Sequence, residues 1–253
     1  MGIEEWFSLR GKTAVVTGAS RGIGRAIALA LAEAGADVAL VQRSGETDVR
    51  GEILRLGRRC EIFQFDLNNQ DHARSVIPAV LERFGAVDIL VNNAGVQRRR
   101  PSLEFTETDW DDVMQVNLKA VWTLCQAAGR FMVPRGSGKI INIASVMSFS
   151  GGIHIPAYAA SKGAVAQLTK TLANEWGGYG VNVNAIAPGF VVTEMSEAVY
   201  RDEQRYAQIT ERIPAGRWGR PEDFQGAAVF LASAASNYVN GHVLTVDGGY
   251  LWK

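Results

Sequence analysis

Short runs of aliphatic and β-branched residues alternate along the chain with longer segments in which apolar residues recur at helical spacing. We expect about seven buried strands from the short runs, at residues 13–17, 38–41, 61–65, 89–91, 139–143, 181–186 and 243–246. The longer segments predict helices at about 25–34, 48–56, 70–84, 109–131, 157–176 and 221–232. This alternation is typical of an α/β, doubly wound parallel sheet with helices on both faces.

The length of the chain favours a single domain. Its 253 residues suit one large α/β unit, and no linker or repeat divides residues 1–253. Residues 193–213 are polar and irregularly patterned between proline and glycine signals, which is typical of a mobile lid. We therefore expect one domain with a lid segment.

Charge and composition exclude several classes of partner. Lys plus Arg equals Asp plus Glu at 26 each, so neither nucleic acid nor an anionic membrane surface is an expected partner. The start of the chain does not read as a signal peptide, and no apolar run approaches the ~20 residues of a membrane span, so we expect a cytoplasmic protein. Cys60 and Cys125 are isolated, which favours buried free thiols over a metal site.

A glycine-rich loop, Gly18-Ala19-Ser20-Arg21-Gly22-Ile23-Gly24, follows the first strand and opens a helix. Glycines let the backbone approach a pyrophosphate at a helix N-terminus, where free N–H groups attract anions. The glycine spacing differs from the Gly-x-Gly-x-x-Gly fingerprint and is weak evidence by itself. The prediction of a dinucleotide site rests on the position of the loop, after a strand and at the start of a helix.

The second strand ends at Gln42-Arg43, where a dinucleotide-binding fold meets the adenosine ribose. An acid there would take the 2′-hydroxyl, whereas Arg43, with Arg21 as a second cation, would suit a 2′-phosphate. This favours NADP, with NAD as the alternative, unless both arginines are only solvated surface residues. Asp66, after the third strand, could meet the adenine or cap the next turn.

The fourth strand runs into Asn92-Asn93-Ala94-Gly95, and small residues and amides at a strand's carboxyl end suit a ligand crevice. Arg98, Arg99 and Arg100 follow at once. Either one of them meets an anionic substrate or all three are solvated.

Tyr158 and Lys162 lie four residues apart, so on a helix they share one face. A tyrosine hydroxyl has a pKa of roughly 10, and a nearby ammonium would lower it toward the working range of a base. Ser145, after the fifth strand, could hold the oxygen whose proton Tyr158 moves. Asn117 lies in the middle of a predicted helix, where an asparagine is unfavourable, so we expect its side chain to have a specific role.

These motifs share one edge of the predicted sheet. The glycine loop, Asn92–Gly95, Ser145 and Pro188-Gly189 all follow strand carboxyl ends. Right-handed crossovers place the reversal of strand order between the strands at 13–17 and 89–91, which opens a crevice there.

With these motifs the chain resembles the short-chain dehydrogenase/reductase family over nearly its full length. The resemblance implies a Rossmann-like fold and an NAD(P)-linked oxidoreductase with a small-molecule substrate. It implies that Tyr158 is the acid/base, that Lys162 lowers its pKa and holds the nicotinamide ribose, and that Ser145 binds the substrate oxygen. Asn117 would organise a water that links Lys162 to solvent. The expected cofactor-binding residues are Gly18, Ser20, Arg21, Gly22, Ile23, Gly24, Gln42, Arg43, Asp66, Leu67, Asn93, Ala94, Gly95, Tyr158, Lys162, Pro188, Gly189, Val191 and Thr193.

A narrower resemblance is to 2-dehydro-3-deoxy-D-gluconate 5-dehydrogenases. That group is not sharply separated in sequence from 2-deoxy-gluconate 3-dehydrogenases and reductases of uronate-derived deoxyketo acids. The residues that carry it are 103–105, 109–114, 148–153, 173–176 and 213–219. It implies a small deoxy-keto sugar acid as substrate. We expect Arg98 or Arg99 to hold its carboxylate, His154 to meet a hydroxyl, and Trp218 to close over it with the lid. Such enzymes from pectin breakdown are mostly linked to NAD, from which Gln42-Arg43 departs.

Three alternatives differ in substrate or in class. A gluconate-type dehydrogenase or a 3-oxoacyl-carrier reductase would keep the chemistry, and the latter needs a basic patch for an acidic carrier. A cofactor-binding sensor would have lost activity, but Asn117, Ser145, Tyr158 and Lys162 are all intact.

Helices at 109–131 and 157–176 are apolar on more than one face, and the family resemblance implies a homotetramer. The aromatic tail at 250–252 could pack on a neighbouring subunit.

Overall fold

The core of the molecule is a seven-stranded parallel sheet, seen in a computed structural model that describes residues 2–43, 45 and 47–253. The strands are β1 (Thr13–Thr17), β2 (Asp37–Gln42), β3 (Cys60–Gln64), β4 (Ile89–Asn92), β5 (Gly138–Ile143), β6 (Val181–Pro188) and β7 (Val243–Val246). Their order is β3-β2-β1-β4-β5-β6-β7, and each neighbouring pair is parallel. The predicted reversal between β1 and β4 is confirmed.

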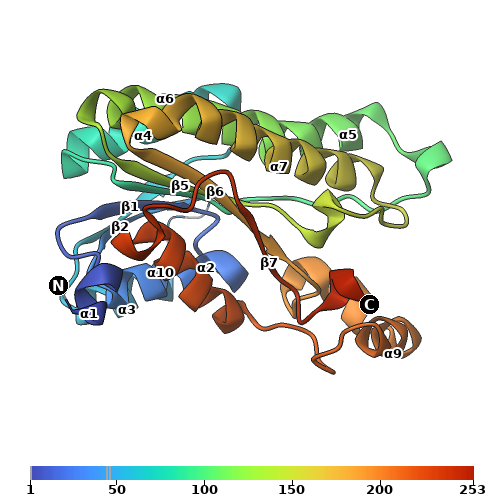
Figure 1. Cartoon of the computed structure of the whole chain (residues 1–253). Coiled ribbons are helices and arrows are strands. Elements are labelled where there is room, and N and C mark those ends of the chain that lie inside the picture. Colours follow the sequence, from blue (N-terminus) through green and yellow to red (C-terminus); the bar gives the residue numbers. More distant parts are fainter. Residues whose placement is uncertain (1, 44, 46) are drawn as a thin grey trace.

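Helices cover both faces of this sheet (Figure 1). Their bounds are α1 (Ile3–Phe7), α2 (Gly22–Glu33), α3 (Asp48–Arg55), α4 (Gln70–Phe84), α5 (Glu107–Met114), α6 (Ala120–Arg135), α7 (Pro156–Trp176), α8 (Glu197–Tyr200), α9 (Glu203–Glu211) and α10 (Gln225–Ala232). Figure 1 shows α4 to α7 on one face and α1, α2, α3 and α10 on the other. The doubly wound α/β fold is therefore confirmed.

Two hydrophobic cores form where the helices pack on the two faces of the sheet. Successive strand residues point to opposite faces, so Val15 belongs to one core and Val16 to the other. Leu124 of α6 packs on the side of Val15, and Ile27 of α2 packs on the side of Val16. Both sides of the sheet are thus buried, which explains why the strands are nearly continuous in apolar residues.

The predicted helix at 109–131 is helical throughout but is not a regular α-helix over its whole length. It consists of α5, a π-helical segment at Gln115–Lys119, and α6, which continues to Arg135. A π segment is rare and frequently marks a functional site. The segment contains Asn117, whose side chain is completely buried. This backbone irregularity gives the polar residue a place that a regular helix would not.

A series of hydrogen-bonded polar side chains crosses the core between α6, α7 and the sheet. Asn92 Nδ2 donates to Asn142 Oδ1 at 2.8 Å, and Asn142 Nδ2 donates to Thr169 Oγ1 at 3.0 Å. Asn92 Nδ2 also contacts the Sγ atom of Cys125 at 3.2 Å. Because buried polar groups are costly without partners, this chain fixes β4, β5 and α7 relative to one another.

The predicted lid has a small core of its own. Residues 193–213 form the 3₁₀ turn Glu194–Ser196 and the helices α8 and α9. Trp218 and Tyr250 pack there against Val199 and Ile213. The expected packing of Tyr250 on a neighbouring subunit is wrong, because its ring lies 5.0 Å from Phe190 of the same chain and is buried. Trp252 is 83% exposed, and for it that contact stays a prediction.

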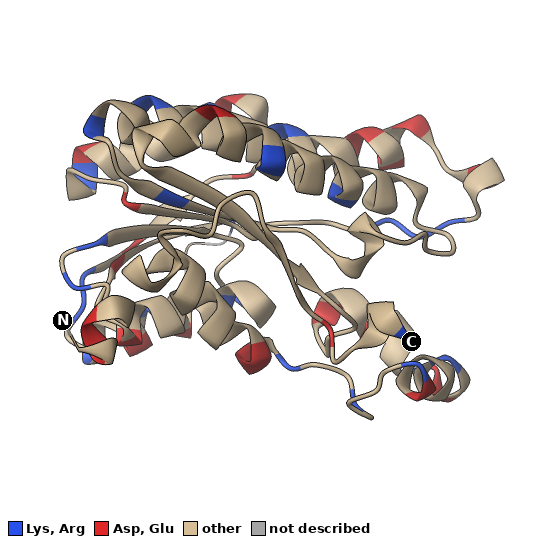
Figure 2. Ribbon diagram, in the orientation of Figure 1, with Lys and Arg blue, Asp and Glu red and all other residues tan. Residues whose placement is uncertain are grey.

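Residues of both charge signs occur along the helices on both faces of the sheet (Figure 2). Within the described ranges, no helix is long and apolar enough to cross a membrane. The expected cytoplasmic location stays a prediction.

Candidate active site

The crevice at the carboxyl ends of the strands begins with a seam between β1 and β4. Thr17 Oγ1 accepts hydrogen bonds from the N–H groups of Asn93 and Ala94, both at 3.0 Å. Asn93 Nδ2 in turn donates to the carbonyls of Thr17 at 2.9 Å and Gly18 at 3.0 Å. The end of β4 is thereby fixed against the glycine loop.

Two glycines of the loop, Gly18 and Gly24, pack too closely against their neighbours to carry a Cβ atom. A Cβ atom at Gly24 would lie 2.2 Å from the carbonyl oxygen of Gly18 and 2.3 Å from Asn93 Nδ2. Gly18 and Gly22 have positive φ angles of 64° and 56°, which favour glycine. The N-cap of α2, Arg21, makes no side-chain cap hydrogen bond. This arrangement fits a dinucleotide pyrophosphate, whose oxygens would meet the N–H groups of the first helical turn.

Tyr158 and Lys162 lie on α7 and face the end of β5. Ser145, directly after β5, is hydrogen-bonded to the Tyr158 hydroxyl and accepts the N–H of Met147 at 3.1 Å. Lys162 Nζ donates to the Ile143 carbonyl at 2.6 Å and lies 5.7 Å from the centroid of the Tyr158 ring. The structure therefore brings Ser145, Tyr158 and Lys162 together as the sequence predicted.

Burial sets the protonation of this group. It raises the pKa of Tyr158 above its ordinary value, and the hydrogen bond with Ser145 acts in the opposite direction. It lowers the pKa of Lys162 to about 8. Lys162 Nζ is directed at the Ile143 carbonyl, and the expectation that it lowers the pKa of Tyr158 stays a prediction.

Asn117 reaches the crevice from the π segment. Its Oδ1 accepts the N–H of Val96 at 2.8 Å, and its Nδ2 donates to the Val96 carbonyl at 2.9 Å and to Ser161 Oγ at 3.3 Å. The side chain thus ties the backbone after Gly95 to α7. The expected water between Asn117 and Lys162 stays a prediction.

The residues expected around the adenosine lie at the ends of β2 and β3. Gln42 is buried at the end of β2, and the next residue, Arg43, is exposed. Asp66 accepts the N–H of Asn68 at 3.0 Å, so it caps the turn as one of the two alternatives proposed. Leu67 beside it is buried.

Arg21 points to a different partner from the one expected. Its guanidinium forms an ion pair with Glu194 at 2.6 Å, and both side chains are more than half exposed. In this structure Arg21 is paired with Glu194, and its role as a second cation for a 2′-phosphate stays a prediction.

The segment after β6 lies over the glycine loop. A Cβ atom at Gly22 would lie 3.6 Å from Thr193 Cγ2, and one at Gly189 would lie 2.7 Å from the Cα of Asp247. Val191, two residues before Thr193, pairs with Gly219 in an isolated parallel bridge. Pro188 ends β6, two residues beyond the predicted end of the strand. The expected cofactor-binding residues of this segment thus border the crevice.

The three arginines after β4 have different partners. Arg98 forms ion pairs with Asp109 at 3.5 Å and Asp112 at 3.1 Å, and Arg100 pairs with Asp109 at 2.9 Å. Arg99 instead donates to the Ile153 carbonyl at 3.3 Å and to Gln97 at 3.4 Å. Of the two arginines expected to hold a carboxylate, Arg98 is therefore engaged with acids, and Arg99 is the better candidate.

The other expected substrate residues differ in position. His154 is exposed and has a positive φ of 61°, a strained backbone conformation for a residue with a side chain. Trp218 is only 3% exposed, with its ring stacked on Tyr206 at 5.4 Å between centroids. Trp218 therefore packs beneath the lid, and the expected direct contact with substrate does not fit this burial.

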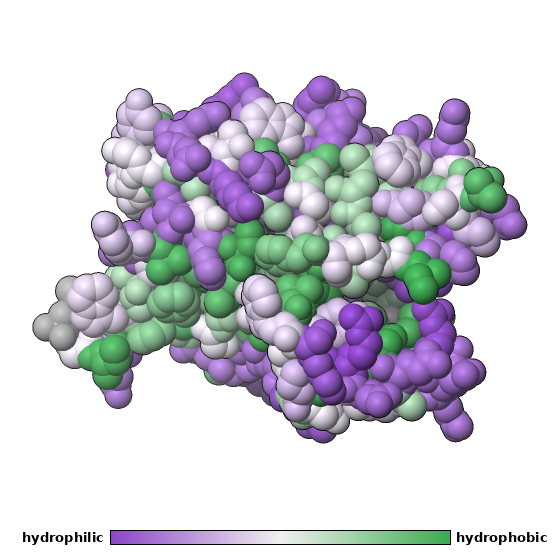
Figure 3. Space-filling model, turned by 45° about the vertical axis from the view of Figure 1, so that its right-hand side comes forward, coloured by the Kyte–Doolittle hydropathy of each residue, from purple (hydrophilic) through white to green (hydrophobic). Residues whose placement is uncertain are grey.

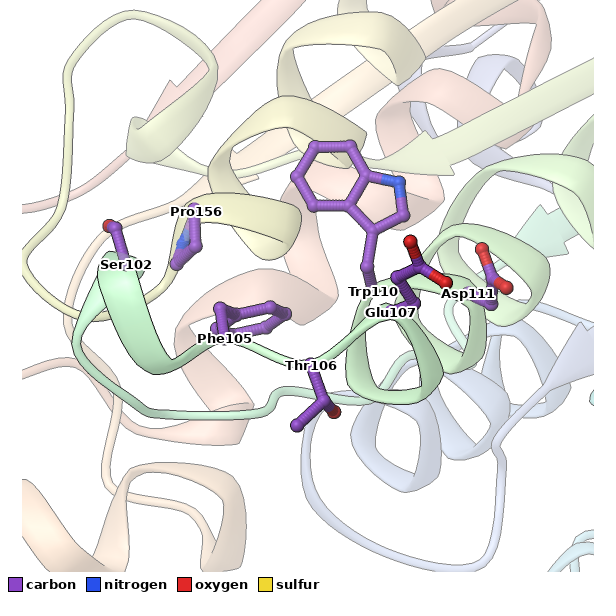
Figure 4. Close-up of a pocket in the computed structure, with 7 residues that line it drawn as sticks. All are labelled: Ser102, Phe105, Thr106, Glu107, Trp110, Asp111 and Pro156. Carbon is purple, nitrogen blue, oxygen red and sulfur yellow. The ribbon is translucent and has the colours of Figure 1, made fainter.

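A pocket of about 460 Å³ lies outside this crevice. Figure 4 shows its lining residues, Ser102, Phe105, Thr106, Glu107, Trp110, Asp111 and Pro156. They come from the start of α5, the turn before it and the first residue of α7, and they include none of the predicted site residues.

Comparisons with known proteins agree with this geometry. A family model described as enoyl-(acyl carrier protein) reductase matches residues 18–251. The 2-dehydro-3-deoxy-D-gluconate 5-dehydrogenase of Escherichia coli K12 is 50% identical over 246 residues, which are 97% of each chain. A structure from Beutenbergia cavernae with bound NADP is 50% identical, with a TM-score of 0.94, and covers 98% of this chain and 100% of its own. The gluconate 5-dehydrogenase of Burkholderia cenocepacia, in complex with NADP and tartrate, is 43% identical, with a TM-score of 0.94 and 98% coverage of both.

The fold and the site define an NAD(P)-dependent oxidoreductase that acts on CH–OH groups. The chain belongs to the short-chain dehydrogenase/reductase family.

Proposed function

We propose that this enzyme interconverts the C5 hydroxyl and the corresponding ketone of 2-dehydro-3-deoxy-D-gluconate, with NADP as its preferred cofactor. The observation that carries the proposal is the convergence of Ser145, Tyr158 and Lys162 beside the crevice between β1 and β4. The E. coli relative, at 50% identity over 97% of both chains, bears this activity in its name.

The proposed roles follow from the positions of the side chains. Ser145 holds the reacting oxygen of the substrate, and Tyr158 takes its proton in oxidation or returns it in reduction. When bound, the nicotinamide accepts the hydride from the substrate carbon in oxidation and gives it back in reduction. Lys162 lies beside Gly95, where the missing side chain leaves room, and would hold the nicotinamide ribose.

A substrate panel with both NADH and NADPH tests the activity. We expect 2-dehydro-3-deoxy-D-gluconate and its 5-keto partner to give the highest kcat/KM, measured by nicotinamide absorbance, with D-gluconate, 5-ketogluconate and a 3-oxoacyl thioester below them. Highest kcat/KM on gluconate would favour the gluconate-type alternative, and highest kcat/KM on the thioester would favour the carrier reductase. Cofactor binding without any turnover would favour the sensor.

Replacement of the acid/base tests the chemistry. Tyr158→Phe should lower kcat by about two to four decades, because the proton loses its donor and acceptor. The variant should keep its circular dichroism spectrum and cofactor affinity, and Tyr179→Phe, a change at an exposed tyrosine, serves as the matched control. Substantial turnover by Tyr158→Phe would contradict the assignment.

The raised pKa of Tyr158 also fixes the expected pH dependence. A phenol with a raised pKa stays protonated through neutral pH, so kcat/KM for ketone reduction should be level there and fall only in alkaline solution. For oxidation, kcat/KM should rise over the same alkaline range as the phenolate forms. A plateau for oxidation already reached below neutral pH would contradict this protonation state.

The preference for NADP is proposed from the end of β2. The position at the end of β2 holds Gln42 in place of an acid that would accept a ribose 2′-hydroxyl, and the exposed Arg43 can donate to a 2′-phosphate. The relatives from B. cenocepacia and B. cavernae contain NADP. Arg21 is left out of this proposal because it pairs with Glu194.

Removal of the Arg43 side chain, at the end of β2, should weaken the binding of NADP more than the binding of NAD. A charge-assisted hydrogen bond contributes roughly 1.5–3 kcal/mol, so Arg43→Ala should weaken NADP binding by about one to two decades and NAD binding much less. Fluorescence titration measures both affinities, with Arg55→Ala on α3 as an exposed control. An equal loss for both cofactors, or a wild type that prefers NAD, would count against NADP.

We also propose that the enzyme is a homotetramer. All four residues of β7, an edge strand, are partly exposed, and Figure 3 shows hydrophobic surface across the middle of one face. Leu103, Trp110 and Trp122 are exposed on the layer of α5 and α6. Exposed apolar surface on two sides of a subunit suits a closed assembly with two kinds of contact.

Light scattering at micromolar concentration should give four times the mass of one chain. A monomer at that concentration would contradict the proposal.

A further inference from the structure

One stripe of side chains along α5 and α6 separates its charges by sign. Exposed or partly exposed residues recur every three or four positions from the first turn of α5 onward, as one face of a helix requires. They are Glu107, Asp111, Gln115, Lys119, Trp122, Gln126 and Arg130, which we call the outward stripe. Both acids of the stripe precede the π segment, and both cations lie at its last residue or beyond it.

The charges of the outward stripe differ from others on the same helix. Asp109 and Asp112 pair with arginines of the loop after β4. Within the residues that the structure describes, no acid or cation of the stripe forms an ion pair. A helix dipole favours acids in its first turn and cations in its last turn, which explains Glu107 alone. Lys119 lies in the middle of the helical stretch 107–135 and needs another explanation.

A groove of about 580 Å³ lies between α4 and the basic half of the stripe. Ile77 and Leu81 line it from α4, and Lys119, Trp122 and Arg130 line it from the other side. The Trp122 side chain is 41% exposed. An exposed indole and two cations beside an apolar groove suit a protein surface that is acidic and partly apolar.

The acidic half of the stripe has that complementary character. Glu107 and Asp111 line the pocket of about 460 Å³ together with Trp110 and Phe105 (Figure 4). The Trp110 side chain is 40% exposed. One helical line thus carries an acidic half and a basic half, each beside an exposed indole. A surface that contains both members of a complementary pair can bind a second copy of itself across a two-fold axis.

The spacing of the charges locates that axis. In an antiparallel pair of stripes, Asp111 can meet Lys119 of the partner subunit, and Glu107 can meet Arg130 of the partner subunit. The midpoint of the first pair along the chain is position 115, and that of the second lies between positions 118 and 119. Both midpoints fall within the π segment Gln115–Lys119 and differ by about one helical turn, which long side chains can span. Two separate acid–base pairs therefore agree on one axis.

We propose that a second copy of this chain packs antiparallel on the outward stripe, with the two-fold axis over the π segment, so that the acidic half of each copy meets the basic half of the other. The inference specifies one contact of the proposed tetramer and does not depend on the proposed substrate. The π segment contains Asn117, whose side chain binds Val96 and Ser161. The second copy thus covers the irregular backbone that places Asn117, and assembly stabilises this part of the site.

Two charge-reversed variants test the surface. The first combines Lys119→Glu with Arg130→Glu and makes the stripe acidic throughout. The second combines Glu107→Lys with Asp111→Lys and makes it basic throughout. Each variant alone should associate through this surface at least about a hundredfold more weakly than the wild type, because like charges face each other at both ends. Sedimentation velocity at micromolar concentration should then give half the wild-type mass or less.

An equimolar mixture of the two variants should recover the wild-type mass, because an acidic stripe then faces a basic one. Arg55→Glu on α3 and Glu4→Lys on α1, at exposed residues of the opposite helical layer, are matched controls and should keep the wild-type mass. Wild-type mass in either variant alone, or a mixture that does not regain it, would overturn the contact and leave the stripe to solvent or to another partner.

Hydrogen exchange tests the link to Asn117 without any substrate, so failure of the proposed activity leaves the result unchanged. Amides at 115–119 should exchange at least about tenfold faster in each variant alone and slow again in the mixture. Unchanged exchange in the dissociated variants would overturn the stabilisation of the π segment.

The same measurements separate the contact from the tetramer. A wild-type dimer that both variants dissociate would contradict the tetramer and support the contact, whereas a wild-type monomer would overturn both. Circular dichroism and thermal melting check the fold of each variant. If a double variant does not fold, Arg130→Glu and Glu107→Lys alone take its place, and their mixture decides.

Discussion

The hydrogen bonds between Thr17 and the Asn93–Ala94 segment hold the crevice in place. They join the ends of β1 and β4, the neighbouring strands at which the chain reverses direction across the sheet. Asn93 also binds the Gly18 carbonyl, so the same seam fixes the glycine loop. Because Gly24 packs against these atoms with no space for a side chain, the helix dipole of α2 is directed at this point. The proposed cofactor site lies against that seam.

Burial has opposite effects on the two titratable residues of the site, and both effects favour the uncharged form. The pKa of Tyr158 is raised and that of Lys162 is lowered to about 8. A neutral phenol hydrogen-bonded to Ser145 can give a proton to a ketone oxygen, whereas oxidation needs the phenolate. The proposed proton transfer at Tyr158 is therefore linked to pH through the burial of the phenol.

The segment at 193–213 packs around a hydrophobic cluster of its own. Its aromatic cluster, with Trp218 between Tyr206 and Phe190, is separate from the two cores of the sheet. The Arg21–Glu194 pair connects it to the glycine loop, but exposed ion pairs of this kind contribute only about 0–1 kcal/mol. The proposed opening of the lid therefore costs little at this ion pair and leaves the cluster packed.

The sequence by itself determined the sheet, its reversal point and the meeting of Ser145, Tyr158 and Lys162, because apolar periodicity sets the strands and parallel strands bring their carboxyl ends to one edge. It also predicted a lid at 193–213 and offered two arginines, Arg98 and Arg99, for a carboxylate. Only the tertiary structure decided that Arg98 is paired with acids, that Arg21 pairs with Glu194 and that Trp218 is buried. It also gave the π segment around Asn117 and the direction of the Tyr158 pKa. Local spacing specifies which element a residue joins, whereas its partners and its loss of solvent come from elements far away in the chain.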